Sequence, residues 1–233
     1  MKTKMIKKTN PLISVLIPTY NNGKYIKQAI ESVYAQNYDN IEIIVVDDGS
    51  TDNTKEIVEK YKDIKYFYTK HKGIPFVRNL ALEKSHGEYI AFLDSDDYWL
   101  PEKLNTQIQY FKNHSECEIV FTKHENFFEE EKIKTDKRAI HEKKQETIEN
   151  KILPSALIKK RLFEKYGVFD ENFQTGEDTE LIYRMTKKGV SFDCCIDKVL
   201  YMRRLHGNNI TLIKNPKYLK VIADILRNEI LNK

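Results

Sequence analysis

The sequence has no long apolar run and no marked excess of charge of either sign. No stretch approaches the ~20 apolar residues that a membrane-spanning helix requires, so we predict no transmembrane segment. The first apolar run, residues 12–17, ends at Pro18 and is too short for the apolar core of a secretory signal. We therefore predict a cytoplasmic protein. Four lysines precede this run and form either a solvated tail or a loose peripheral attachment to the inner face of a membrane: Lys2, Lys4, Lys7 and Lys8.

Cysteine is scarce, with three residues in the whole chain. Cys194 and Cys195 are adjacent, and an odd total argues against a disulfide framework. No spacing of cysteines and histidines matches a structural zinc site. In the absence of a secretory signal, we predict that the thiols are reduced.

The charges nearly balance, because 39 basic and 35 acidic side chains leave a net charge of +4. This balance argues against the strongly basic surface with which proteins bind nucleic acid, so we predict no nucleic-acid partner. At 233 residues, 32% of them charged and 40% hydrophobic, the chain can bury the core of one large domain or of two lobes.

The first half of the chain alternates short apolar runs with segments whose apolar residues repeat at helical spacing. Three successive strand–helix units predict an α/β fold, with a mostly parallel, Rossmann-like sheet flanked by helices. The predicted strands cover residues 12–17, 41–46, 64–68 and 89–93, and the predicted helices cover residues 25–34, 52–61 and 74–84.

The second half is less regular. Residues 124–150 are dense in Glu and Lys and predict a variable loop. Residues 214–233 place four apolar residues on one face, which predicts an amphipathic helix that packs on the body or on a second copy in a homodimer, with membrane contact as the alternative. Further helices are predicted from Pro101 through Phe111, at residues 162–169 and at 177–188, and short strands at 119–121, 191–193 and 199–201.

One stretch concentrates acidic residues directly after a predicted strand. The run from Tyr89 to Leu93 leads into Asp94, Asp96 and Asp97. Open α/β sheets bind ligands beyond the carboxyl ends of their strands, and three clustered carboxylates repel one another unless something compensates. A divalent cation with oxygen ligands, together with a phosphate, meets that requirement. The alternative is a solvated acidic turn that opens the helix at Pro101.

Two other strands also end in residues that can bind a ligand. Pro18, Thr19 and Tyr20 follow the first strand, and Asp48 follows the second. Neither segment matches the glycine-rich dinucleotide fingerprint or a Walker sequence. Asp48 is suited to accept a hydrogen bond from a base N–H, such as that of uracil, and Tyr20 is suited to stack on the same ring. The alternative for Asp48 is a capped turn with Gly49.

Several short motifs follow one another along the chain. They are Pro18-Thr19-Tyr20-Asn21, Val46-Asp47-Asp48-Gly49-Ser50-Thr51-Asp52, Arg78-Asn79, Gly87-Glu88-Tyr89-Ile90, Leu93-Asp94-Ser95-Asp96-Asp97, Gly167-Val168-Phe169-Asp170-Glu171, Gly176-Glu177-Asp178 and Arg203-Arg204-Leu205-His206-Gly207-Asn208. Each motif alone is weak, but their order and spacing are specific. Taken together, they closely resemble the family 2 inverting glycosyltransferases, which have the GT-A fold, and the resemblance covers roughly residues 12–212.

The resemblance implies a UDP-sugar donor and a cation, Mn²⁺ or Mg²⁺. Arg78 would contact the diphosphate, unless it is simply a surface arginine of its helix. Asp96 would bind the cation, His206 would complete that site or else belong to a surface loop, and Asp97 would assist the cation or cap the next helix. The remaining residues of the implied nucleotide-sugar site are Pro18, Thr19, Tyr20, Asp48, Asp94 and Ser95.

The resemblance further implies that Asp178 is the catalytic base, which takes the proton of the acceptor hydroxyl in a single in-line displacement. Glu177 would bind the acceptor or the helix end. For this pair the alternative is two acids stabilised at a helix N-terminus by the macrodipole. The acceptor would be a glycan or a lipid-linked glycan of a bacterial surface polysaccharide, such as lipopolysaccharide or capsule.

The resemblance divides the chain into three parts. These are a nucleotide-sugar-binding half (1–115), an acceptor-binding half (116–213) with its variable loop, and the C-terminal helix (214–233). Two other functions remain open at this stage: a metal-dependent nucleotidyltransferase, and a non-catalytic relative that binds a nucleotide or a glycan.

Overall fold

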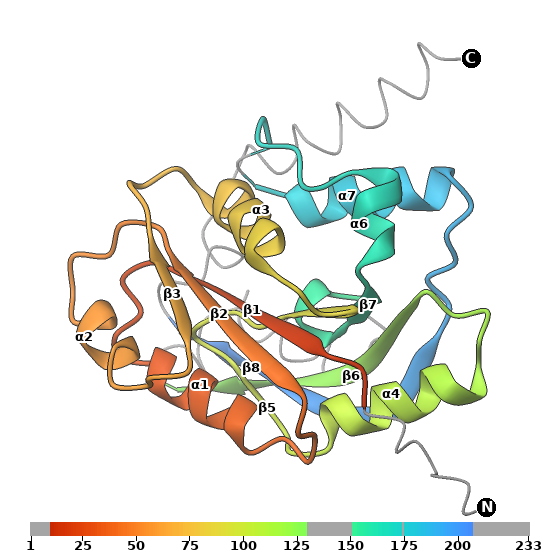
Figure 1. Ribbon diagram of the computed structural model, residues 1–233, viewed down its shortest axis with the longest axis horizontal. Helices are drawn as coiled ribbons and strands as arrows, with labels where there is room; N and C mark the ends of the chain where they lie inside the picture. Colours follow the sequence, from red (N-terminus) through yellow and green to blue (C-terminus); the bar gives the residue numbers. More distant parts are fainter. Residues whose placement is uncertain (1–9, 130–150, 174, 207–233) are drawn as a thin grey trace, which may run out of the picture.

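The computed structural model describes residues 10–129, 151–173 and 175–206. Its first half is a regular alternation of strand and helix (Figure 1), which confirms the predicted pattern. The elements are β1 (Ile13–Thr19), α1 (Ile26–Tyr34), β2 (Ile41–Asp47), α2 (Thr54–Val58), β3 (Lys65–Tyr68), α3 (Ile74–Lys84) and β4 (Tyr89–Phe92).

The second half adds strands and helices in a less regular order. They are β5 (Tyr98–Trp99), α4 (Lys103–Asn113), β6 (Ile119–Phe128), the 3₁₀ helix η2 (Leu153–Ser155), β7 (Leu157–Lys159), α6 (Arg161–Tyr166), α7 (Glu177–Lys187) and β8 (Cys195–Leu205). Within the described ranges, no helix has both the length and the apolar character needed to cross a membrane.

One mixed sheet runs through both halves, in the order β3-β2-β1-β4-β7-β6-β8-β5. The strands β3, β2, β1 and β4 are parallel, as predicted, whereas β7 is antiparallel to both β4 and β6. Because four parallel strands lie side by side, the residues that follow them meet at one edge of the sheet.

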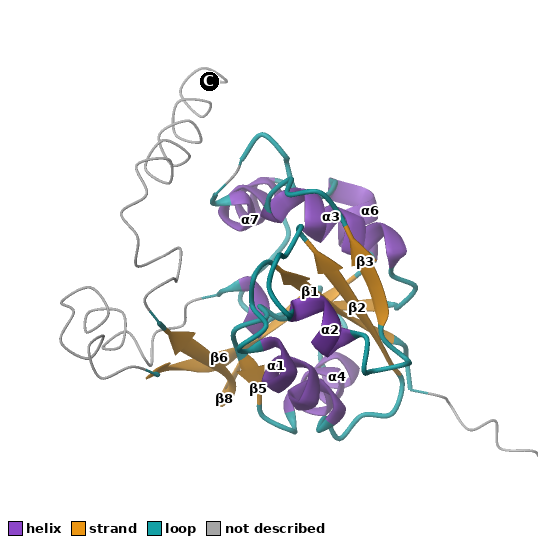
Figure 2. Ribbon diagram, turned by 90° about the vertical axis from the view of Figure 1, so that its left-hand side faces the viewer, coloured by secondary structure: helices purple, strands orange, loops and turns teal. Residues whose placement is uncertain are grey.

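Helices cover both faces of the sheet, with α1, α2 and α4 on one face and α3, α6 and α7 on the other (Figures 1 and 2). Successive side chains of a strand point to opposite faces, and β1 follows this rule. Val15 and Ile17 pack in the core with α1, whereas Leu16 packs in the core with α3, and all three are fully buried. Burial on both faces explains why these strands are continuous apolar runs.

The structure corrects several predicted boundaries. β6 continues to Phe128, so residues 124–128 are strand rather than loop, because they pair along β8. Residues 191–193 are not a strand, since Ser191 and Asp193 hydrogen-bond to each other, and residues 199–201 lie inside the longer β8. The helix predicted through Tyr61 ends at Val58. The short strands β5 and β7 were not predicted. Three predicted features lie outside the described residues: the N-terminal lysines, the loop beyond residue 129 and the C-terminal helix.

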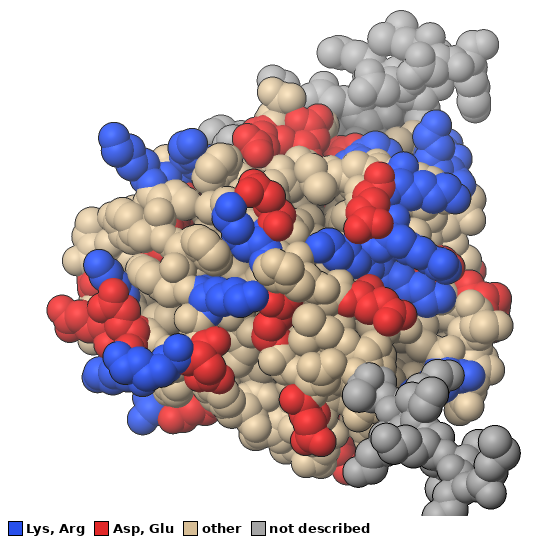
Figure 3. All heavy atoms as spheres, in the orientation of Figure 1, with Lys and Arg blue, Asp and Glu red and all other residues tan. Residues whose placement is uncertain are grey.

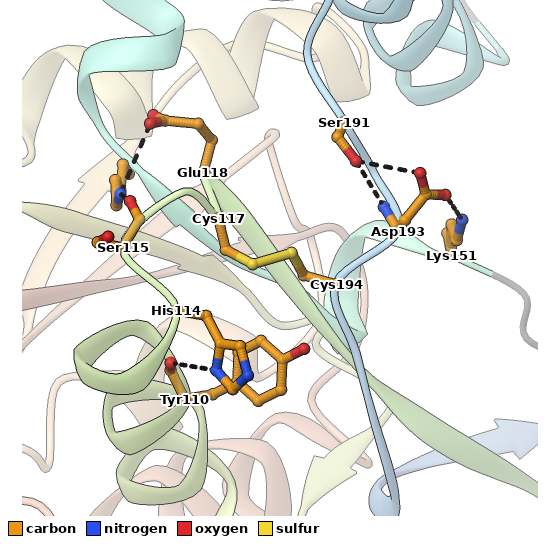
Figure 4. Close-up of a disulfide and its surroundings, with 10 residues drawn as sticks. Tyr110, His114, Ser115, Cys117, Glu118, Lys151, Ser191, Asp193 and Cys194 are labelled. Carbon is orange, nitrogen blue, oxygen red and sulfur yellow. Dashed lines mark hydrogen bonds and ion pairs between the residues drawn. A yellow bond between two sulfur atoms is a disulfide. The ribbon is translucent and has the colours of Figure 1, made fainter.

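A disulfide joins Cys117 to Cys194, so the prediction of reduced thiols is wrong (Figure 4). The two cysteines are 77 positions apart in the sequence, but Cys117 lies two residues before β6 and Cys194 directly precedes the neighbouring strand β8. Those strands run parallel, which brings their starts together and places the two Cα atoms 6.3 Å apart. Cys195 is not part of this bond.

We predict that the denatured, unreduced protein contains one titratable thiol rather than three. Reduction should lower the free energy of unfolding by about 2–4 kcal/mol, because the bond closes a long loop in the unfolded chain. Thiol titration and denaturant unfolding with and without reductant measure these effects. Cys195→Ser is the control and should leave stability and the disulfide intact. Three reactive thiols in the unreduced protein would contradict the prediction.

At the end of the sheet where β1 and β2 begin, Glu42 ties three strands together. Its carboxylate accepts hydrogen bonds from Ser14 Oγ (2.5 Å), Lys65 Nζ (2.6 Å) and the His86 backbone N–H (2.5 Å). Burial by itself would raise the pKa of Glu42, but the hydrogen bonds from Lys65, Ser14 and His86 outweigh it and lower the pKa to about 2.

We predict that Glu42→Gln flattens the acid limb of the stability–pH curve. A carboxyl whose folded-state pKa is lowered stabilises the fold above its unfolded pKa, and this stability is lost as the pH falls toward the folded pKa. For a shift from 4.5 to about 2, the stabilisation at neutral pH is about 3 kcal/mol. Denaturant unfolding between about pH 6 and pH 2 measures it. Glu31→Gln, which breaks an exposed pair with Lys27, is the control and should change little.

Candidate functional site

The sequence-predicted residues gather at the carboxyl edge of the parallel strands. Thr19 ends β1 beside Asp47 of β2, and the residue after β4, Leu93, donates its backbone N–H to Leu16 O (3.0 Å). Asp48 and Asp94 therefore leave the sheet at the same edge. The first turns of α3 and α7 and the end of β8 complete the surroundings of this edge, so segments more than a hundred residues apart contribute to one site.

The acidic motif after β4 presents its residues in different directions. Asp94 is half-buried, and its Oδ1 lies 3.4 Å from Arg78 Nη2. Ser95 is buried and accepts a hydrogen bond from Asn22 Nδ2 (2.7 Å). Burial raises the pKa of Asp94, Arg78 opposes that effect, and the neighbouring Asp96 adds to it. The carboxylates of Asp94 and Asp96 are thus held close enough to repel one another.

Asp96 is paired with His206, whose Nε2 lies 3.0 Å from Asp96 Oδ2. The His206 ring is buried and stacks on Tyr25 at a centroid distance of 5.0 Å. His206 was predicted either to belong to the site or to a surface loop, and its burial against Asp96 favours the site. Within the described residues, no group of three or more His, Cys, Asp and Glu side chains is arranged to hold a metal ion.

Asp97 does not cap the next helix. Its buried carboxylate accepts hydrogen bonds from the Tyr201 hydroxyl and from the Arg204 backbone N–H (2.6 Å). Burial raises the pKa of Asp97, and Asp96 and Asp94 raise it further. Helix α4 begins without a side-chain cap, so the predicted cap is wrong.

Arg204 fastens the end of β8 to the acidic loop. Its Nε donates to Asp96 O (2.8 Å), and its guanidinium packs 4.9 Å from the Tyr25 ring centre. The bonds of Asp97 and Arg204 together fix the path of β8 against the acidic loop. The chain therefore arrives two residues later with His206 beside Asp96. The sequence shows an arginine pair, Arg203 and Arg204, but nothing in it indicates that Arg204 contacts the acidic loop.

Arg78 is buried, so the alternative of a surface arginine is wrong. Its Nη1 donates to Glu177 Oε1 (2.5 Å), and its guanidinium lies 5.8 Å from the Phe92 ring and 5.5 Å from the Phe169 ring. Burial opposes the charge on Arg78, but Glu177, Asp94 and Asp178 outweigh burial and raise its pKa. Arg78 Nε is also buried, with no hydrogen-bond partner.

Glu177 and Asp178 begin α7, directly after Gly176, whose φ of +78° favours glycine. Glu177 is buried, and burial raises its pKa while Arg78 opposes the shift. Asp178 is half-buried and accepts a local hydrogen bond from Thr179 N (2.7 Å). Asp178 is close enough to influence the pKa values of both Arg78 and Asp94, so it belongs to the same cluster.

On the other side of the site, Asp48 holds the loop that follows β3. Asp48 Oδ1 accepts the Lys72 N–H (2.7 Å) and Oδ2 accepts the Gly73 N–H (2.9 Å). The turn after β2 is closed by Asp47, whose Oδ1 accepts the Ser50 N–H (2.7 Å), so the alternative that Asp48 caps this turn is wrong.

Three further predicted residues lie near Asp48. Thr19 is buried, and its Oγ1 has no hydrogen-bond partner. Pro18 lies within β1, opposite Val46 of β2. Tyr20 is 45% exposed and stacks on His71 at a centroid distance of 4.3 Å. His71 was not predicted, although it follows the third parallel strand and so had to reach the same edge.

A parallel α/β sheet with ligand-type residues at its carboxyl edge defines the class of open α/β proteins that bind a ligand beyond the ends of their strands. Within that class, residues 14–167 match the model of the family described as Glycosyl transferase family 2. The chain therefore belongs to glycosyl transferase family 2.

Relatives and solved structures agree with this assignment. An uncharacterized glycosyltransferase of Rickettsia typhi is 34% identical over 222 residues, which cover 87% of this chain and 66% of that protein. The UDP-Glc:alpha-D-GlcNAc-diphosphoundecaprenol beta-1,3-glucosyltransferase WfaP of Escherichia coli is 43% identical over 120 residues, which cover 50% of this chain and 46% of that protein.

The structure of S. aureus TarS 1-349 in complex with UDP-GlcNAc superposes with a TM-score of 0.72 at 24% identity, covering 92% of this chain and 65% of that one. This likeness confirms the predicted GT-A fold. The chain spans about one third to two thirds of the length of the first relatives that it matches.

The Arg78–Glu177 pair generates a stability prediction. Arg78→Met should lower the free energy of unfolding by roughly 3–5 kcal/mol, because it leaves buried carboxylates without their cation. The loss should shrink as the pH falls, since burial raises the pKa of both Glu177 and Asp94 and protonation removes their charge. Denaturant unfolding at several pH values measures both effects.

The control for this prediction is Arg161→Met. It removes a second Arg–Glu pair, that of Arg161 with Glu118, in which the arginine side chain is 64% exposed. An exposed pair should contribute less than about 1 kcal/mol. If Arg78→Met and Arg161→Met lowered the free energy of unfolding equally, the prediction that the buried Arg78–Glu177 pair contributes more would be contradicted.

Proposed function

We propose that the protein is an inverting, metal-dependent glycosyltransferase that moves one sugar from a UDP-sugar to a hydroxyl of a glycan or lipid-linked acceptor in bacterial surface glycan synthesis. One observation carries the proposal: Asp48, Arg78, Asp96 and Asp178 come from separate segments and converge at one sheet edge. Two relatives support the donor and the pathway. WfaP of Escherichia coli is a UDP-Glc:alpha-D-GlcNAc-diphosphoundecaprenol glucosyltransferase, and TuaG of Bacillus subtilis is a putative teichuronic acid biosynthesis glycosyltransferase.

The donor nucleotide would lie between Asp48 and Arg78. Asp48 would accept the N–H of uracil, and the exposed ring of Tyr20 would stack on the base. The unpartnered Thr19 Oγ1 offers a hydrogen bond on the same side, next to Pro18. Arg78 is suited to the diphosphate because its buried guanidinium keeps an unused Nε donor.

Asp96 and His206 would hold the cation. A carboxylate oxygen and an imidazole nitrogen that already meet at 3.0 Å provide two ligands on one side, and phosphate oxygens and water would supply the others. This donor pair suits Mn²⁺ better than Mg²⁺, which rarely takes nitrogen ligands. A bound cation would offset the negative charge of the departing diphosphate.

Asp178 would act as the general base. The acceptor oxygen attacks the anomeric carbon and gives its proton to Asp178, while the bond from that carbon to the diphosphate breaks and its electron pair leaves with UDP. Attack opposite the leaving group inverts the anomeric centre. We expect Glu177 to act indirectly, by holding Arg78 at the diphosphate, because its side chain is buried against that guanidinium.

The test is release of UDP from a panel of UDP-sugars with Mn²⁺, comparing the wild type with Asp178→Asn. The variant should lose about 10²–10⁴ in rate, the usual contribution of a general base, while UDP and Mn²⁺ still raise its melting temperature. Glu180→Gln, on the same helix but paired with Arg184, is the control.

Full turnover by Asp178→Asn would remove Asp178 from the mechanism. Binding of UDP without turnover of any sugar would favour a non-catalytic relative, and release of sugar 1-phosphate in place of UDP, with UMP transferred to the acceptor, would favour nucleotidyl transfer.

A further inference from the structure

His71 makes two contacts that a nucleotide base would be expected to make. Its ring stacks on Tyr20, with the centroids 4.3 Å apart and the planes inclined by 25°. Its Nδ1 lies 2.8 Å from Asp48 Oδ2 and 3.2 Å from the Asp48 carbonyl oxygen. Both of these atoms are acceptors, so Nδ1 must carry a proton. A flat ring thus stacks on the tyrosine and donates an N–H to the carboxylate.

The backbone that carries His71 is fixed, whereas its ring is not enclosed. Thr69 N donates to Asp47 O (2.9 Å), and the amides of Lys72 and Gly73 donate to Asp48. A Cβ on Gly49 would lie 3.0 Å from His71 N, which shows how closely the loop is packed. The His71 side chain is nevertheless 62% exposed, so the ring can rotate away from Tyr20 while the loop stays in place.

His71 and a base compete for the same atoms. Asp48 Oδ2 already accepts the Gly73 N–H and the His71 N–H, and a carboxylate oxygen has about two acceptor sites. The Gly73 donor belongs to the backbone and is held by the loop. A base that stacks on Tyr20 and donates to Asp48 Oδ2 must therefore replace the imidazole.

Building on the nucleotide site proposed above, we propose that His71 is a built-in competitor for the donor base. The imidazole occupies the base position in the unliganded protein, and uridine binding displaces it into solvent. The ring keeps Tyr20 and Asp48 covered between turnovers, and it lowers the affinity for every nucleotide that uses this position.

The test is the dissociation constant of UDP, measured by calorimetry with Mn²⁺ for the wild type and for His71→Ala. We expect UDP to bind His71→Ala roughly three- to tenfold more tightly, which corresponds to one lost ring stack and one lost exposed hydrogen bond. The control is His114→Ala. His114 stacks on Tyr110 at a centroid distance of 4.0 Å near the disulfide and should leave UDP binding unchanged (Figure 4).

A second measurement follows the His71 ring directly. In the NMR spectrum of the unliganded protein, the Tyr20 ring should shift the ring protons of His71 upfield, and UDP should remove that shift. The proposal that His71 competes with the base would be overturned if UDP bound His71→Ala equally or more weakly, or if UDP left the upfield shift unchanged. The glycosyltransferase proposal would stand in either case. If neither protein binds UDP, the proposed nucleotide site fails and the competitor fails with it.

Discussion

The structure of the site depends on mutual repulsion among carboxylates and on the buried arginine that offsets it. Asp94, Glu177 and Asp178 all act on Arg78, and burial by itself disfavours the charges of Asp94, Glu177 and Arg78. Arg78 comes from the first turns of α3, and Glu177 begins α7, so the ion pair also joins helices from the two halves of the chain. The same interaction therefore places the acids and holds together the elements that carry them.

The parallel part of the fold could be predicted because its signals are local. Strands β1, β2 and β4 are mostly apolar, since helices bury both faces of the sheet, and helical spacing follows β1 and β2. β6 lacks that signal. Lys123, His124, Glu125 and Asn126 look like a loop in the sequence, and they form a strand because β8 supplies the partner. The disulfide escaped prediction for the same reason, since only the pairing of β6 with β8 brings the two cysteines together.

The site, like the fold, has a part that could be predicted from the sequence and a part that could not. Asp48 and Asp94 follow parallel strands, so topology alone brings them to one edge. The partners that fix their surroundings cannot be derived from spacing. Nothing in the sequence links Asp97 to Tyr201 or Arg78 to Glu177, because these contacts depend on how β8 and α7 pack on the first half. The face of the protein drawn in Figure 3 carries interspersed charges of both signs, which agrees with the nearly balanced composition.

The two halves contribute different steps to the proposed reaction. The residues proposed to bind the donor nucleotide lie between residues 18 and 96, inside the family match, whereas Asp178 and His206 lie beyond its end. Asp97 and Arg204 connect the two regions, because they fix β8 against the acidic loop and so bring His206 to Asp96. In the proposed reaction, the first region would bind the nucleotide, while the proton acceptor and the second metal ligand would come from residues beyond the family match. Under the same proposal, changes in the predicted acceptor-binding half would alter which acceptor receives the sugar while Asp48 stays in place.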